Sequence, residues 1–266
     1  MDLPIFQVDA FAAKVFEGNP AAVCPLQDWL EEKTLQTIAA ENNLSETAFF
    51  VPEGNVYRLR WFTPQCEVEL CGHATLASAF VLLNILNPQK SSVQFQTRSG
   101  LLTVHKDGDL LSMDLPASPP WKSENPSTDI SRALMNGNPS GSPAAVFQTK
   151  SKFLAIYENE EQVVNAHPNF ELLRGLHPFT VCITAPGKRS DFVSRYFAPS
   201  YGIPEDPVTG SSHCTLVPYW ATRLNKTEFH ARQLSQRQGE LWCELKKDRV
   251  ILKGKAVLYL RGSISI

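Results

Sequence analysis

An internal duplication is the feature that most limits what this chain can fold into. In the first half, Phe62-Thr63-Pro64 precedes Gly72-His73-Ala74-Thr75-Leu76, and in the second half Phe197-Ala198-Pro199 precedes Ser211-Ser212-His213-Cys214-Thr215-Leu216. The string Pro-Ala-Ala-Val also occurs once in each half. Matches in the same order, one set per half, predict a duplicated lobe, and their period is far too long for a solenoid.

Hydrophobic patterning gives both halves a mixture of short strands and helices. Residues 72–86 form the most apolar helix predicted, hydrophobic nearly all round, as a helix enclosed by other structure should be. A matching helix is predicted over 210–224, and a more amphipathic one over 28–42. Strands are predicted around them, near 5–11, 21–23, 47–51, 57–62, 93–95, 101–105, 110–115, 144–147, 153–157, 179–184 and 192–197.

A polar, Pro/Ser-rich stretch from Pro116 to Ser142 is the predicted boundary between the lobes. The predicted organisation is an N-terminal lobe of residues 1–117 and a C-terminal lobe of residues 118–266. The last strand of the second lobe could pack back on the first.

Composition and charge exclude several classes of partner. Hydrophobic residues make up 43% of the 266 and charged residues 20%, which allows a substantial core. The 25 basic and 27 acidic side chains are scattered, so no surface for nucleic acid or an anionic membrane is indicated. The N-terminus lacks a signal peptide, and the longest apolar-rich run, 74–83, is too short to span a membrane. A cytoplasmic location is therefore predicted.

The cysteines and the missing motifs argue against a metal or a cofactor. The six cysteines occur singly, without zinc-ligand spacing, and although their even number allows disulfides, reduced thiols are favoured in the cytoplasm. Phosphate-binding glycine loops, dinucleotide fingerprints, the hydrolase elbow and the HExxH spacing are all missing from the sequence. We expect no metal and no cofactor.

In each half, a glycine opens an apolar helix, at Gly72 and at Gly210. A helix start presents unpaired backbone N–H groups and a partial positive charge, which suit a carboxylate, and glycine allows a ligand to approach closely. Ordinary N-caps are the alternative, since Thr209 and Ser211 are standard capping types. Two such starts on matched helices, however, could bind a small anion from both sides.

Four titratable residues lie near these helix starts or between apolar segments. Glu46 precedes an apolar, aromatic strand, where partial desolvation suits a general acid or base, although composition alone favours a glutamate that closes a turn. Asp206 lies at the mouth of the second helix, but Asp before Pro is also a frequent turn former. His73 and His213 occupy similar positions near the two helix starts, where an isolated histidine is more often structural.

Four segments carry a resemblance to a known family. The chain resembles the phenazine biosynthesis-like (PhzF) family, and most of all the animal phenazine biosynthesis-like domain proteins, in Phe16-Glu17-Gly18-Asn19-Pro20-Ala21-Ala22-Val23, Asn43-Leu44-Ser45-Glu46-Thr47-Ala48-Phe49, Leu70-Cys71-Gly72-His73-Ala74-Thr75 and Glu205-Asp206-Pro207-Val208-Thr209-Gly210-Ser211. The resemblance implies an α+β, diaminopimelate-epimerase-like fold. Two pseudo-symmetric lobes, each a β-barrel around a central α-helix, would enclose the active site in the cleft between them.

The resemblance also implies a function. It is that of a homodimeric, cofactor-independent isomerase, in which Glu46 of the Ser-Glu-Thr motif moves a proton between carbon atoms of a small carboxylated substrate. His73 and Asp206 would share the catalytic work. The candidate substrate-binding residues are Gly72, Gly210, Ser211 and Asn19.

The wider superfamily contains racemases and epimerases that use two opposed cysteines, each just before one of the two glycines. Here the first position is Cys71, but its counterpart is Thr209. A two-thiol mechanism needs a thiolate on one face and a thiol on the other, so threonine excludes it and leaves the chemistry to Glu46. Cys214 lies inside the second helix and cannot substitute.

Two alternatives stay open. The chain could be a retired enzyme that serves as a protein-binding or regulatory module, although its intact polar residues count against this. It could also be an amino-acid racemase or epimerase that uses Glu46 as one base. The physiological substrate is not identified by the sequence.

Overall fold

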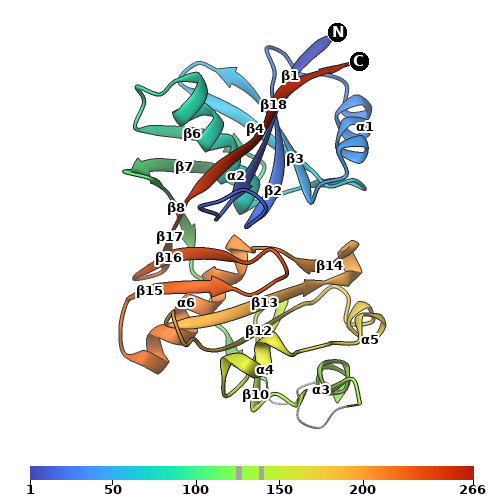
Figure 1. Cartoon of the computed structure of the whole chain (residues 1–266), viewed down its shortest axis with the longest axis vertical. Helices are drawn as coiled ribbons and strands as arrows, with labels where there is room; N and C mark the ends of the chain where they lie inside the picture. The colour runs from blue at the N-terminus through green and yellow to red at the C-terminus, as the bar shows by residue number, and fades with distance from the viewer. Residues whose placement is uncertain (124–127, 138–140) are drawn as a thin grey trace. The chain divides into compact units, whose positions relative to one another are not determined.

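The computed structural model describes residues 1–123, 128–137 and 141–266, and the chain divides into two compact units (Figure 1). Unit 1 contains Met1–Asp114 and Ile251–Ile266, and unit 2 contains Leu115–Val250. Residues 251–266, which we assigned from the sequence to the second lobe with its last strand returning, lie in unit 1. Of the predicted boundary segment 116–142, residues 124–127 and 138–140 lie outside the described residues.

Unit 1 is built mainly from strands. Its helices are α1 (Glu32–Asn42), α2 (Gly72–Phe80) and the π-helical turn η1 (Val81–Leu86), and its strands are β1 (Asp2–Ala10), β2 (Asn19–Pro25), β3 (Glu46–Glu53), β4 (Val56–Phe62), β5 (Glu67–Val68), β6 (Ser92–Thr97), β7 (Gly100–Asp107), β8 (Leu110–Pro116, which ends in unit 2) and β18 (Ala256–Ser265). The helix predicted over 72–86 is α2 continued by η1.

Unit 2 has more helices than its sequence pattern indicated. Its helices are α3 (Thr128–Met135), α4 (Glu160–Val164), α5 (Phe170–Arg174), the 3-10 turn η3 (Pro199–Tyr201) and α6 (Gly210–Leu224), and its strands are β9 (Trp121–Lys122), β10 (Ala145–Gln148), β11 (Lys152–Ile156), β12 (Thr180–Pro186), β13 (Phe192–Ala198), β14 (Ile203–Asp206), β15 (Glu228–Gln233) and β16 (Gly239–Lys246). Strand β17 (Arg249–Gly254) runs from unit 2 into unit 1.

The two units repeat one order of strand pairing. In unit 1, the pairs β1–β2, β2–β3, β3–β4, β4–β6 and β6–β7 are antiparallel, parallel, antiparallel, parallel and antiparallel in turn. In unit 2, the pairs β10–β11, β11–β12, β12–β13, β13–β15 and β15–β16 follow the same alternation. The short strand β5 pairs with β4 in unit 1, and the short strand β14 pairs with β13 in unit 2. Each of them precedes the central helix of its unit. The predicted pseudo-symmetric α+β fold is confirmed.

Helix α2 is enclosed by the strands of unit 1 (Figure 1). Every residue from His73 to Ala79 is buried, and the helix packs against β1, β2, β3 and β18. A helix with apolar side chains on nearly all sides has no face for solvent, so burial on every side is its stable environment. The same reasoning explains why the sequence pattern identified this helix so clearly.

Helix α6 has the bounds predicted from the sequence and contains a proline. Pro218 has no N–H, so the carbonyl group of Cys214, one turn earlier, loses its partner within the helix. The backbone N–H of Ser118 donates to that carbonyl at 2.8 Å. Trp220 on the same helix donates through Nε1 to Thr184 Oγ1 on β12 at 3.0 Å, which anchors α6 inside unit 2.

The turn before β3 sets where Glu46 begins the strand. Helix α1 starts four residues later than the predicted range 28–42 and ends at Asn42. Asn43 adopts the left-handed conformation, with φ 49°, and donates its backbone N–H to Ala39 O at 3.2 Å. Asparagine tolerates this conformation better than most residues, so the chain can reverse and enter β3 at Glu46.

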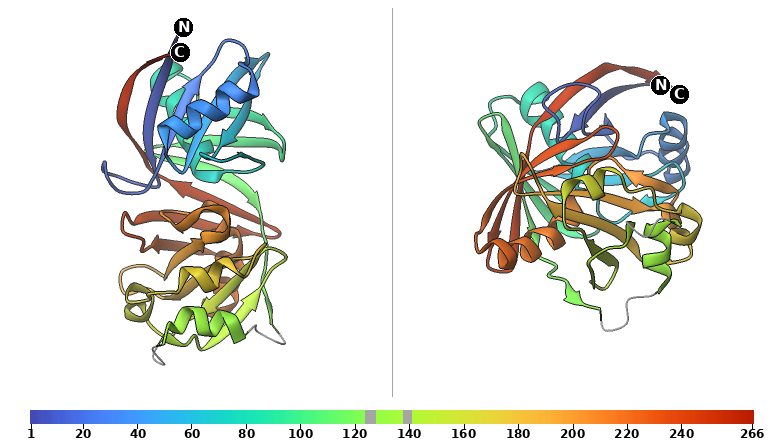
Figure 2. Two further views of the ribbon diagram at one scale, coloured as in Figure 1. Left: turned by 90° about the vertical axis from the view of Figure 1, so that its right-hand side faces the viewer. Right: turned by 60° about the horizontal axis from the view of Figure 1, so that its bottom comes forward.

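The chain ends meet in unit 1. Strand β18 pairs antiparallel with β1 along its length, from Asp2 opposite Ser265 to Ala10 opposite Ala256. The N–H of Ile266 donates to Met1 O at 2.8 Å, and the two termini lie side by side (Figure 2).

In the part of the chain that the structure describes, every helix is too short or too polar to cross a membrane.

Gly18 holds the turn that leads into β2 and Asn19. Its φ is 68°, and a Cβ atom placed there would lie 2.2 Å from the carbonyl oxygen of Ala10 and 2.7 Å from Ala12 Cβ. Both the conformation and the space therefore require glycine. Gly54, in the turn between β3 and β4, has a similar φ of 62° but open space around it.

We expect Gly18→Ala to lower the free energy of unfolding by at least about 1 kcal/mol more than Gly54→Ala, which carries only the conformational cost of about 1 kcal/mol. The difference isolates the clash with Ala10, because the two positions share a backbone conformation. Urea denaturation of both variants measures it. Equal losses would show that the close approach around Gly18 is absent in solution.

Candidate active site

Glu46 and His73 form a buried pair in unit 1. Glu46 is the first residue of β3, and His73 is the second residue of α2. The Nε2 atom of His73 lies 3.1 Å from Oε2 of Glu46, and their side chains are only 6% and 11% exposed. The ring N–H does not point straight at the oxygen, so the pair is a close ionic contact rather than an aligned hydrogen bond. Two sequence-predicted catalytic residues are therefore adjacent.

The other ring nitrogen of His73 faces Asn19 and Cys71. Nδ1 lies 3.2 Å from Asn19 Nδ2 and 3.5 Å from Cys71 Sγ. An amide nitrogen can only donate, so in this amide orientation Nδ1 accepts and the ring proton lies on Nε2, towards Glu46. A second proton on Nδ1 requires the Asn19 amide to turn over so that its oxygen accepts. Asn19, predicted to bind substrate, thus contacts His73.

Opposing effects set the charge of His73. Burial by itself lowers the pKa of His73, but Cys71 and Glu46, which lie on opposite sides of its ring, outweigh the effect of burial. The pKa of His73 therefore lies well above its ordinary value of 6.5. Burial, and then the charge of Glu46, raise the pKa of the Cys71 thiol to about 11. That thiol is therefore neutral near pH 7, which leaves Glu46, 3.1 Å from Nε2, as the neighbour in contact that can stabilise a protonated His73 ring.

Glu46, Cys71 and His73 also carry atoms of the kinds that bind metal ions. One such atom from each residue lies within 4.8 Å of the others. The imidazole, however, turns Nδ1 to Cys71 and Nε2 to Glu46. One ion cannot use both of these contacts, because it would bind a single ring nitrogen.

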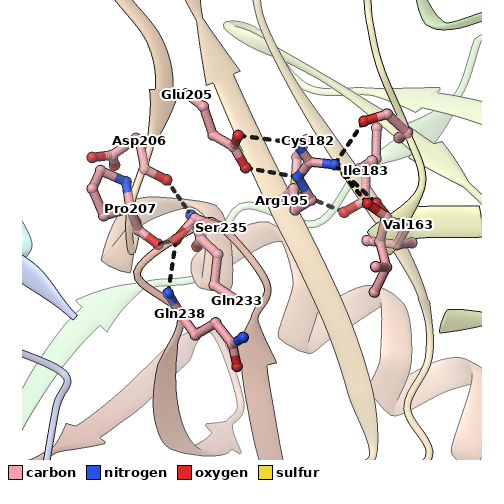
Figure 3. A network of polar contacts seen from close by, with 12 residues as sticks. Val163, Cys182, Ile183, Arg195, Glu205, Asp206, Pro207, Gln233, Ser235 and Gln238 are labelled. Carbon is pink, nitrogen blue, oxygen red and sulfur yellow. Dashed lines mark hydrogen bonds and ion pairs between the residues drawn. The ribbon is translucent and has the colours of Figure 1, made fainter. Parts of the chain in front are cut away.

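Asp206 belongs to a separate polar network in unit 2. It ends β14, and its Oδ2 atom accepts a short hydrogen bond from the hydroxyl group of Thr209. Gln233 on β15 joins both residues. Its Nε2 donates to Asp206 O at 2.8 Å (Figure 3). Its Oε1 accepts from Thr209 N at 2.9 Å. Gln233 is fully buried and was not identified from the sequence.

The loop that carries Asp206 is also fixed from its other side. Arg195 on β13 makes a bidentate contact with Glu205, with Nε–Oε1 and Nη2–Oε2 distances of 2.7 and 2.9 Å (Figure 3). Its Nη1 group donates to the carbonyl groups of Val163 and Ala166 at 3.1 and 2.7 Å. A bidentate guanidinium fixes direction as well as distance, so Arg195 holds the strand that ends at Asp206.

The two glycine helix starts have matching backbones. Cys71 and Thr209 are the N-cap residues of α2 and α6, both extended, and neither side chain caps its helix. Gly72 and Gly210 follow as the first helical residues, and Ser211 is the second residue of α6. The sequence alternative of a Thr209 side-chain cap is thus not realised, because its hydroxyl group donates to Asp206 instead.

His213 does not match His73. It is the fourth residue of α6, a position that corresponds to Thr75 rather than to His73 when the glycines are matched. Its Nδ1 lies 2.9 Å from Thr209 O, and within the described residues its Nε2 has no hydrogen-bond partner. Burial lowers the pKa of His213 to about 4, although the Thr209 contact opposes this. His213 is a neutral structural residue.

Comparisons with known proteins cover the whole chain. The family model described as phenazine biosynthesis-like protein matches residues 8–262. An uncharacterized isomerase of Pseudomonas aeruginosa is 48% identical over 266 residues, 100% of both chains. The bovine phenazine biosynthesis-like domain-containing protein is 41% identical over 290 residues, again 100% of both. A PhzF-family crystal structure from Enterococcus faecalis has a TM-score of 0.94 at 44% identity and covers 100% of both chains.

The two histidines are expected to titrate in opposite directions. In an NMR titration of the imidazole groups, His213 should stay neutral down to about pH 4, and His73 should keep its proton well above pH 6.5. Assignment by His73→Gln and His213→Asn identifies the signals. A midpoint near 6.5 for both residues would contradict the burial and pairing described.

His213 also makes stability depend on pH. Its pKa is depressed in the folded state, so its contribution is complete above pH 6.5 and is lost as the pH falls towards 4. A difference of this size corresponds to about 3 kcal/mol at pH 4. Urea denaturation between pH 6.5 and 5 should show a steeper loss for the wild-type protein than for His213→Asn, which keeps an N–H donor. Equal slopes of the free energy of unfolding against pH in the two proteins would contradict the lowered pKa of His213.

Proposed function

The chain belongs to the phenazine biosynthesis-like protein family and is an isomerase-type enzyme, and from that premise we propose that it moves a proton on a small carboxylated substrate, without a cofactor, through Glu46. The observation that carries the proposal is the buried contact of 3.1 Å between Glu46 and His73. A carboxylate held in a nearly dry site beside a basic partner is a suitable general base.

The proposed reaction has two proton transfers. Glu46 removes a proton from a carbon that a neighbouring conjugated carboxylate or enamine makes acidic. The C–H bond breaks, the carboxylic O–H bond forms, and the electron pair spreads over the conjugated system. In an isomerisation, Glu46 then returns the proton to another carbon. In an epimerisation, Glu46 is one of two bases, and a second group delivers a proton to the opposite face of the same carbon. No oxidation or group transfer is required.

His73 supports both transfers from beside Glu46. While Glu46 is ionised, the imidazolium keeps the carboxylate available as a base. When Glu46 has taken the proton, the same imidazolium can relay a proton or stabilise negative charge on the substrate. Asn19 and Cys71 act on Nδ1 and so influence which protonation state is present.

The remaining predicted residues keep the roles that the resemblance implies. The backbone N–H groups at the start of α2, from Gly72, suit the carboxylate of a substrate or the charge that develops on it. In unit 2, Asp206 is proposed to take part in proton transfer, and Gly210 and Ser211 at the start of α6 to bind substrate.

We expect Glu46→Gln to lower turnover by about 100-fold or more, since a general base contributes about that much, while the fold is retained. The assay is exchange of substrate hydrogens with deuterated solvent, followed by proton NMR. The probes are proline and other α-amino acids, whose inversion reports epimerisation, and alkylidene acids such as methylitaconate, whose double-bond shift reports isomerisation.

Strand β3 offers a matched control. Glu53, at the exposed end of β3, lies in the same strand as Glu46 and can also be changed to glutamine. Glu53→Gln should leave the exchange rate unchanged, and thermal unfolding should be nearly the same for both variants. Full exchange by Glu46→Gln would assign the base to another residue.

The proposal includes a homodimer, which the resemblance implies. Light scattering after gel filtration should give twice the chain mass of 29.6 kDa. A mass of one chain at micromolar concentration would remove the dimer from the proposal without affecting the role of Glu46.

A further inference from the structure

Gln233 is a buried amide with a partner for each of its polar hydrogens. It ends β15, and β15 runs parallel to β13, which also pairs with the strand that carries Asp206. Its Oε1 atom lies 2.9 Å from Thr209 N, and its Nε2 atom lies 2.8 Å from Asp206 O and 3.2 Å from Thr209 Oγ1. One side chain thus contacts both residues at the mouth of α6.

The direction of each of these hydrogen bonds follows from the atoms involved. A backbone N–H can only donate and a carbonyl oxygen can only accept, so the contacts with Thr209 N and Asp206 O independently fix the orientation of the Gln233 amide. Its second N–H hydrogen is then left for Thr209 Oγ1. The hydroxyl oxygen of Thr209 therefore accepts from Gln233, and its own proton must be directed elsewhere.

Asp206 receives that proton. The Thr209 hydroxyl group donates to Asp206 Oδ2, and a carboxyl oxygen without a proton is an acceptor. The three side chains form one directed chain, from Gln233 Nε2 to Thr209 Oγ1 and on to Asp206 Oδ2. Gln233 is fully buried, and Thr209 and Asp206 are 8% and 9% exposed, so little solvent weakens the chain.

We propose that Gln233 is a positioning residue that directs the hydroxyl proton of Thr209 onto Asp206 and thereby holds the Asp206 carboxyl group in its ionised form. The consequence for catalysis rests on the role proposed above for Asp206, whereas the direction of the hydrogen bonds does not. A carboxylate kept ionised can accept a proton from a substrate or from a neighbouring group.

The proposal also gives Thr209 a role at the position where α2 has Cys71. Thr209 is the N-cap residue of α6. Its proton is donated to Asp206 and its oxygen accepts from Gln233, so the hydroxyl group is committed within unit 2. Threonine at this position supports a neighbouring carboxylate instead of acting as the second base.

Three other ionisable residues near Asp206 make their own contacts with different partners. Tyr196 lies opposite Asp206 in the β13–β14 register, and its hydroxyl group donates to Thr180 at 2.7 Å. Glu205 is held by Arg195. His213 contacts the backbone oxygen of Thr209 and is neutral above pH 4. None of these contacts uses the hydroxyl oxygen of Thr209.

The test is a carbon-13 NMR titration of the Asp206 carboxyl group in the protein without substrate, assigned by loss of the signal in Asp206→Asn. Thr209→Val removes the donor and should raise the titration midpoint by about one pH unit or more, as expected for a lost hydrogen bond to a charge. Gln233→Met removes the amide that orients the Thr209 hydroxyl group, without adding charge. It should raise the titration midpoint of Asp206 by a smaller amount.

The double variant separates positioning from a general loosening of the loop. If Gln233 acts through Thr209, adding Gln233→Met to Thr209→Val should move the midpoint no further than Thr209→Val alone. Ser235→Ala is the matched control, because Ser235 Oγ donates to Pro207 O in the same loop at 2.8 Å but touches neither hydroxyl nor carboxylate. It should leave the midpoint unchanged.

Two results would overturn the proposal: an unchanged midpoint in Gln233→Met, or shifts that add in the double variant. If Gln233→Met does not fold, the wild-type protein decides, since a directed Thr209 hydroxyl proton should exchange slowly with solvent and show a nuclear Overhauser contact to the Gln233 amide hydrogens. A rapidly exchanging hydroxyl proton would overturn it. Because no substrate is used, the outcome is independent of whether Glu46 is the base.

Discussion

Each unit buries most of one helix, α2 in unit 1 and α6 in unit 2, and this burial limits where polar chemistry can occur. A buried helix still has a first turn whose backbone N–H groups find no partner within the helix. In unit 1 that turn begins at Gly72, and the starts of two strands supply side chains to it. Asn19 begins β2, Glu46 begins β3, and both contact His73 in the first turn of α2. The buried polar group is thus a consequence of how strands are arranged around the helix.

The two copies of this arrangement have diverged in chemistry while keeping their backbone. Both N-cap residues are extended and both helices open on glycine, yet the side chains do different work. In unit 1 a thiol, an imidazole and a carboxylate are in contact. In unit 2 the corresponding hydroxyl group is tied to a carboxylate and an amide. The two units have similar helix starts, but only the start of α2 is preceded by a thiol.

The sequence predicted the parts of the fold that depend on local pattern. The helix at 72–86 was identifiable because its apolar side chains run round the whole helix, and the helix at 210–224 was predicted as its match in the second half. The family motifs marked Glu46 and His73. Helices α3, α4 and α5 were missed because they are short and partly polar, and their stability comes from packing on the strands of unit 2. Gln233 was missed because its partners lie 24 and 27 residues away in the chain. The sequence placed His73 and His213 in similar positions, but His213 lies two residues further along its helix than His73 does. A shift of two residues along a helix changes which side the ring faces.

The pairing of β18 with β1 has a consequence for the order in which the chain acquires its structure. Unit 2 is one continuous stretch, Leu115–Val250, so all of its residues are present before synthesis ends. Unit 1 has most of its residues first but its closing strand last, and β1 has only β2 beside it until residues 256–265 emerge. On the ribosome the first unit is therefore the last to be completed, and its open edge along β1 is the surface most exposed to wrong pairing in the interval.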